Sequence, residues 1–125
     1  MPLNVLILDD QTTYRRALSR ALQDEYDPVG ASTVDEVAVA APADLAAALC
    51  DVRLDESRPE NRDGLQAMKW LRENRPGTII IAMSAIDDPE LPGETLRHGA
   101  HLFLPKPIRV SDLRAALARL LATPQ

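Results

Sequence analysis

The chain has 125 residues, with 14 Lys and Arg against 19 Asp and Glu and a formal net charge of −5, which argues against a nucleic acid or an anionic membrane as its main partner. This length predicts a single domain, residues 1–125 with 123–125 as a tail, that buries about two-thirds of its unfolded surface. The single cysteine excludes an internal disulfide framework, and no signal peptide or membrane span is recognisable, so we expect a cytoplasmic protein.

Short apolar runs alternate with helical patterns in the first half of the chain. Residues 4–8 are almost wholly apolar, as a strand buried on both faces must be. Apolar residues at three and four spacing predict a helix over 12–24. A weak strand over 28–32 and a short helix over 34–41, which Pro42 ends, follow.

The same alternation continues to the end. Residues 45–50 are rich in alanine, yet the alternation favours a strand there; a helix over 64–74 and a clear strand over 78–83 follow. Asp87-Asp88-Pro89 predicts the start of a fourth helix, which Pro92-Gly93 makes short and loosely held. Residues 101–104 are the fifth strand, and Ser111 is the expected N-cap of the last helix.

This order of elements predicts an α/β fold in which right-handed crossovers build a five-stranded parallel sheet with helices on both faces. Ligands of such doubly wound sheets bind at the carboxyl ends of the strands. Polar residues follow the predicted strands at that edge, namely Asp9, Asp10, Asp51, Ser84 and Lys106. Close carboxylates repel by about 4 kcal/mol per pair at an effective dielectric constant of about 20, so we expect a cation among them.

The chain resembles the receiver domain of two-component response regulators, of the chemotaxis-regulator type, over essentially its whole length. The resemblance rests on short motifs in a fixed order: Leu8-Asp9-Asp10, Cys50-Asp51-Val52-Arg53-Leu54, Asp63-Gly64, Met83-Ser84-Ala85, Gly99-Ala100 and Phe103-Leu104-Pro105-Lys106-Pro107. It implies a flavodoxin-like sheet with strand order 2-1-3-4-5.

The resemblance also implies a phosphorelay function. Asp51 would accept a phosphoryl group from a histidine kinase or phosphotransfer protein. Mg²⁺ would be bound by Asp10 directly, by Asp9 through water, by the Asp51 carboxylate and by the backbone carbonyl of Arg53. These oxygen ligands are the kind that Mg²⁺ prefers.

Three further residues carry roles implied by the same resemblance. Lys106, Ser84 and the N–H of Ala85 would bind the phosphoryl oxygens. Ser84 would then move and admit Phe103 in a two-state switch. The protein would catalyse only its own phosphorylation and dephosphorylation, and would signal by contact with a downstream protein as a monomer or transient homodimer, without nucleic acid or membrane.

Residues 55–62 make the segment after Asp51 several residues longer than is usual in this family. They could screen the phosphoryl group from water, supply an arginine to the site, recognise a partner, or form a solvated insertion.

Two other functions stay open. A receiver-like binding module would keep the fold and signal without phosphorylation. An Mg²⁺-dependent phosphatase that works through an aspartyl phosphate fits less well, because such enzymes need an aspartate where this chain has Arg53.

Overall fold

The computed structural model describes residues 2–122, so the predicted tail lies outside the described residues. The five strands form one parallel sheet in the order β2-β1-β3-β4-β5, which confirms the predicted fold class and strand order. In chain order the elements are β1 (Leu3–Leu8), α1 (Thr12–Leu22), β2 (Tyr26–Ala31), α2 (Val34–Ala40), β3 (Ala47–Asp51), α3 (Asp63–Asn74), β4 (Ile79–Ser84), α4 (Leu91–Arg97), β5 (Leu102–Pro105) and α5 (Val110–Ala122).

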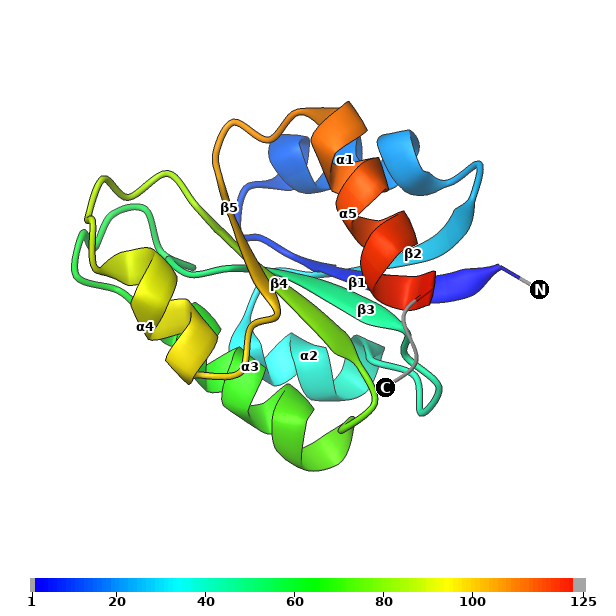
Figure 1. Ribbon diagram of the computed structural model, residues 1–125. Coiled ribbons are helices and arrows are strands. Elements are labelled where there is room, and N and C mark those ends of the chain that lie inside the picture. The colour runs from blue at the N-terminus through cyan, green and yellow to red at the C-terminus, as the bar shows by residue number, and fades with distance from the viewer. Residues whose placement is uncertain (1, 123–125) are drawn as a thin grey trace.

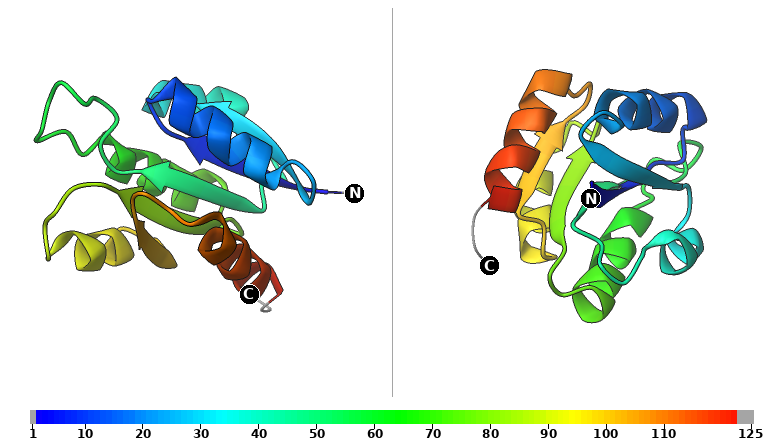
Figure 2. Two further views of the ribbon diagram at one scale, coloured as in Figure 1. Left: turned by 90° about the horizontal axis from the view of Figure 1, so that it is seen from above. Right: turned by 90° about the vertical axis from the view of Figure 1, so that its right-hand side faces the viewer.

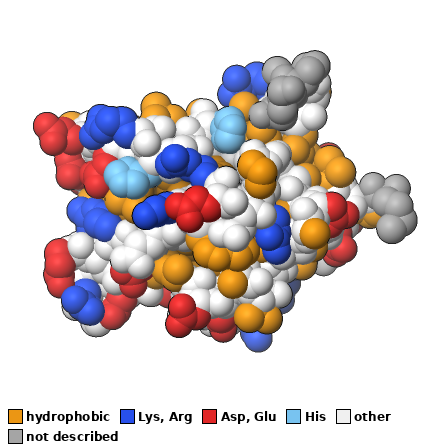
Figure 3. Space-filling view, turned by 90° about the horizontal axis from the view of Figure 1, so that it is seen from below, with side chains coloured by type: hydrophobic (Ala, Val, Ile, Leu, Met, Phe, Trp, Pro, Cys, Tyr) orange, Lys and Arg blue, Asp and Glu red, His pale blue; other side chains and the backbone are white. Residues whose placement is uncertain are grey.

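The helices cover the sheet in two layers. Helices α1 and α5 lie on one face, and α2, α3 and α4 lie on the other (Figures 1 and 2). Seen from the second face, side chains of both charges are interspersed with hydrophobic ones (Figure 3). Among residues 2–122, no helix has the length and apolar character needed to cross a bilayer.

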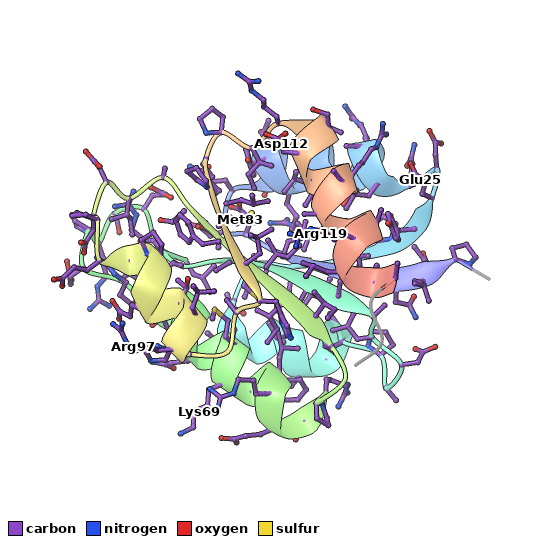
Figure 4. The ribbon with its side chains drawn as sticks, viewed as in Figure 1. Glu25, Lys69, Met83, Arg97, Asp112 and Arg119 are labelled. Atoms are coloured by element: carbon purple, nitrogen blue, oxygen red, sulfur yellow. The ribbon has the colours of Figure 1, made fainter. Side chains whose placement is uncertain are left out.

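The alternation of side chains along each strand builds a core on each side of the sheet. Strands β3 and β4 are buried along their whole length. Ile7, Leu49 and Met83 pack on the face covered by α1 and α5, and Figure 4 shows Met83 in the interior. Cys50 and Ile80 point the other way, into the core between the sheet and the helices α2, α3 and α4. The central strands are therefore a rigid base for the loops at their carboxyl ends.

Two predicted helix starts are wrong. The fourth helix begins at Leu91, because Asp88 accepts a hydrogen bond from the N–H of Glu90 in a turn that precedes the helix (3.0 Å). Pro92, rather than Pro89, therefore occupies the first turn. Helix α5 begins at Val110, so Ser111 lies inside its first turn and is not the N-cap.

Candidate phosphoacceptor and metal site

The residues predicted to form a site meet at one edge of the sheet. Asp9 and Asp10 directly follow β1, Asp51 and Ser84 are the last residues of β3 and β4, and Lys106 directly follows β5. A cavity of about 80 Å³ opens there, and it is lined by Gln11, Asp51, Arg53, Glu56, Ser84, Ala85, Ile86 and Lys106. Parallel strands thus bring together side chains that are almost a hundred residues apart.

Three carboxylates form the acidic part of the site. Oxygens of Asp9, Asp10 and Asp51 lie within 4.8 Å of one another. Asp9 is wholly buried and Asp51 is 2% exposed. The Nζ atom of Lys106 lies 2.7 Å from Oδ2 of Asp9 and 3.2 Å from Oδ2 of Asp51. One ammonium group therefore contacts two of the three acids, and a net negative charge is left for a cation to balance.

Backbone hydrogen bonds hold these residues in place. The N–H of Lys106 donates to the carbonyl oxygen of Ser84 (2.9 Å), which ties the loop after β5 to the end of β4. The N–H of Gly64 donates to the carbonyl oxygen of Val52 (2.9 Å) and so joins the start of α3 to the end of β3. Oδ1 of Asp9 accepts a hydrogen bond from the N–H of Gln11 (2.9 Å), and Oδ2 contacts Lys106, so both carboxylate oxygens of Asp9 have a partner.

The burial of the acids changes their proton affinity. Burial raises the pKa of Asp51 to about 7, with Asp9 and Asp10 adding repulsion and Lys106 opposing the rise. Burial, followed by the charges of Asp9 and Glu56, also raises the pKa of Asp10. Burial alone would lower the pKa of Lys106, but the hydrogen bond to Asp9 and the charges of both acids raise it. The pKa of Lys106 therefore stays above that of Asp51, so the lysine keeps its proton when Asp51 is ionised.

The site fits a hard divalent cation. Oδ1 of Asp10 is buried and has no hydrogen-bond partner, whereas both oxygens of Asp9 have one. A buried carboxylate oxygen without a partner is costly unless a cation occupies the space beside it. This difference favours Asp10 as the direct ligand and Asp9 as the more distant one, in the manner of Mg²⁺ sites that keep several waters.

Ser84 and Ala85 line the same cavity as Asp51 and Lys106. The hydroxyl oxygen of Ser84 accepts the N–H of Ile86 (2.9 Å), so its own hydrogen is free to be donated to a ligand. Phe103 lies on β5, half-buried against the core on the α3 and α4 side of the sheet. The predicted switch residues are therefore on adjacent strands, and their movement stays a prediction.

Tyr14 is a residue of this site that the sequence reasoning missed. Its ring lies 4.4 Å from Nζ of Lys106, measured to the ring centroid, and its hydroxyl accepts the N–H of Ile108 (3.1 Å). An ammonium group has three N–H donors. Lys106 donates two hydrogen bonds to carboxylates, and the Tyr14 ring covers another side of its ammonium group. No sequence motif marks Tyr14, because the contact depends on how α1 meets the loop after β5.

The long segment after Asp51 is not a loosely attached insertion. Asn61 is 8% exposed, and its Oδ1 accepts the N–H groups of Leu54 and Asp63, each at 3.0 Å. One buried amide thus fastens both ends of the segment, which extends beyond the carboxyl end of the sheet (Figure 2, left). Inside it, Arg53 and Glu56 form an ion pair at 2.7 Å, and both line the cavity.

Comparison with known proteins agrees with this geometry. A family model described as the response regulator receiver domain matches residues 5–118. The chain belongs to this family and is a receiver domain of the kind found in two-component response regulators. Among solved structures, the receiver domain protein of Methanospirillum hungatei JF-1 superposes with a TM-score of 0.85 at 23% identity, covering 98% of this chain and 95% of that one. The beryllofluoride-activated DrrB receiver domain gives 0.86 at 22% identity, covering 98% and 100%. These structural similarities show that the two proteins share the fold of this chain.

Curated relatives share more of the sequence. The photosynthetic apparatus regulatory protein RegA of Rhodovulum sulfidophilum is 31% identical over 91% of this chain and 61% of its own length. The regulatory protein AtoC of Escherichia coli is 31% identical over 94% of this chain and 25% of its own length. The chain thus spans between a quarter and three-fifths of the length of these relatives.

Proposed function

We propose that this receiver domain accepts a phosphoryl group on Asp51 from a phosphohistidine of a histidine kinase or phosphotransfer protein. The observation that carries the proposal is the grouping of a buried Asp51 with Lys106 and with an unpartnered oxygen of Asp10. An Oδ atom of Asp51 attacks phosphorus, the P–N bond of the phosphohistidine breaks, and the electron pair leaves with the imidazole. Asp51 must be ionised to attack.

The residues around Asp51 position and neutralise the transferred group. Asp10, Asp51, the backbone carbonyl of Arg53 and, through water, Asp9 would hold Mg²⁺, which would supply positive charge against the repulsion between carboxylates and phosphoryl oxygens. Lys106 gives up one carboxylate contact to bind a phosphoryl oxygen, and the hydroxyl of Ser84 and the N–H of Ala85 donate to others. Catalysis is then positioning and charge, and the protein acts on no substrate other than its own phosphoryl group.

The signal leaves the domain through protein contact. Movement of Ser84 toward the phosphoryl group frees space for Phe103, and the surface of α4, β5 and α5 changes shape. The target is a downstream protein, reached by a monomer or a transient homodimer, without nucleic acid or membrane. The buried free thiol of Cys50 suits a reducing cytoplasm.

The test is labelling by acetyl phosphate in the presence and absence of Mg²⁺, followed by intact mass. We expect wild type to gain one phosphoryl group only with Mg²⁺, and Asp51→Asn to gain none. A folded wild-type protein that binds no Mg²⁺ and takes up no phosphoryl group from acetyl phosphate or a histidine-kinase donor would instead favour the binding module that signals without phosphorylation.

Tyr14 supplies a second prediction, as a positioning residue for Lys106. We expect Tyr14→Leu to slow labelling about two- to thirtyfold, since a partly buried cation–π contact is worth about 0.5 to 2 kcal/mol. Tyr14→Phe keeps the ring and loses only the bond to Ile108, so it should stay within about twofold of wild type. Equal rates for Tyr14→Leu and wild type would show that the ring does not position the lysine.

A further inference from the structure

The segment after β3 places an ion pair at the mouth of the site. Nη2 of Arg53 lies 2.7 Å from Oε2 of Glu56, and the side chains are 22% and 40% exposed. Both residues line the cavity that contains Asp51, Ser84 and Lys106. Glu56 is therefore an acid beside the position at which a second anion, the phosphoryl group, has to be accommodated.

The guanidinium group of Arg53 is only partly used. Its Nη2 atom donates to Glu56, while its Nε atom is buried and has no partner. Nε and a terminal nitrogen of a guanidinium together form a fork suited to the two oxygens of a carboxylate or phosphate. Glu56 thus occupies one half of the fork, and the buried half lacks an acceptor.

Hydrogen bonds within the segment tie down the backbone on both sides of Glu56. Asn61 fastens the ends of the segment through Leu54 and Asp63. Next to Glu56, Asp55 accepts hydrogen bonds from both the N–H (3.0 Å) and the hydroxyl (2.5 Å) of Ser57. The folded segment therefore keeps the backbone of Glu56 near Arg53, while the partly exposed side chain of Glu56 can still leave the ion pair.

We propose that Glu56 is a built-in competitor of the phosphoryl group: it occupies Arg53 in the unphosphorylated protein and is displaced when Arg53 binds a phosphoryl oxygen on Asp51. The proposal rests on the proposed function, because Asp51 must carry the phosphoryl group. The exchange of one anion for another at Arg53 lowers the affinity of the site for a phosphoryl group and so sets how readily the domain is activated.

The test is a titration with beryllofluoride, a phosphoryl mimic, at saturating Mg²⁺, followed by the ¹⁹F NMR signal of the bound form. We expect Glu56→Gln to bind about two- to fivefold more tightly than wild type, as a half-exposed ion pair allows. Glu60→Gln is the matched control, because Glu60 lies in the same segment and pairs with Arg58 (3.5 Å) outside the cavity; it should bind like wild type.

The double variant Arg53→Gln, Glu56→Gln separates competition for Arg53 from simple repulsion by Glu56. Competition predicts that removing Glu56 brings no gain once Arg53 is absent. A gain of the same size in the Arg53→Gln background, or none in the wild-type background, overturns the proposal. If wild type binds beryllofluoride and Asp51→Asn does not, the proposed function is supported whatever the Glu56 variants show. If wild type binds no beryllofluoride, both the proposed function and the role of Glu56 are overturned.

Discussion

Replacing Gly64 by alanine is expected to lower the free energy of unfolding by about 3 kcal/mol or more, at the upper end of what overpacking costs. Gly64 lies in the first turn of α3, and its N–H bonds to the carbonyl oxygen of Val52. A Cβ atom there would overlap the carbonyl oxygen of Asp51 and come within 2.7 Å of the Cα atom of Val52. Both contacts are with backbone, which cannot rotate away, so α3 would have to move off β3.

The measurement is urea denaturation of wild type, Gly64→Ala and Gly77→Ala. Gly77 is the matched control, because a Cβ atom there would meet nothing within 4 Å, and its substitution should change stability by less than about 1 kcal/mol. Because Gly64 packs against the backbone of Asp51, the proposed phosphoacceptor, we also expect any folded Gly64→Ala protein to label slowly. Equal midpoints for the two variants would mean that the helix start is not held against β3.

Replacing Asp51 by asparagine is expected to stabilise the metal-free protein, and to do so increasingly as pH rises. The pKa of Asp51 is raised from 3.8 to about 7 by burial. Between these values the folded protein binds more protons than the unfolded chain, so wild-type stability falls as pH increases. Asparagine has no charge to lose, so the gain should grow from about 2 kcal/mol at pH 5 to about 4 kcal/mol at pH 8, as a pKa raised from 3.8 to about 7 implies.

Chemical denaturation in EDTA at several pH values tests this prediction. Asp55→Asn is a suitable control, because hydrogen bonds from Ser57 lower the pKa of this partly exposed acid rather than raise it. That variant should not be stabilised at high pH. A gain for Asp51→Asn of the same size at pH 5 and pH 8 would show that the charge of Asp51 is not what destabilises the site. Added Mg²⁺ should reduce the stability gain of Asp51→Asn at pH 8, because Mg²⁺ is bound more tightly by the ionised aspartate of wild type than by the neutral asparagine.

The sequence predicted the sheet well, since continuous apolar runs such as residues 78–83 have few alternatives to a buried strand. It also predicted the positions of Asp9, Asp10, Asp51, Ser84 and Lys106, because parallel strands end at one edge. The starts of two helices were predicted wrongly, although Asp88 and Ser111 are good capping residues. Asp88 instead forms a turn before α4, and α5 begins one residue before Ser111.

Contacts between distant elements were not predictable in this way. The packing of Tyr14 on Lys106 depends on the angle at which α1 meets the loop after β5, and periodicity contains no such information. The role of Asn61 was hidden for a similar reason, since an asparagine in a polar segment is usually exposed. The ion pair of Arg53 and Glu56 lies in the same segment and was not predicted either.

The most direct test of the account is to locate the phosphoryl group after labelling with acetyl phosphate and Mg²⁺. Borohydride reduction of the acyl phosphate, followed by peptide mass spectrometry, identifies the modified aspartate. We predict modification at Asp51 alone, with Asp9 and Asp10 unmodified, because Asp9 is paired with Lys106 and Asp10 is the proposed ligand of the cation. Modification of Asp9 or Asp10 in wild type, or labelling that persists in Asp51→Asn, would contradict the assignment of Asp51 as the phosphoacceptor.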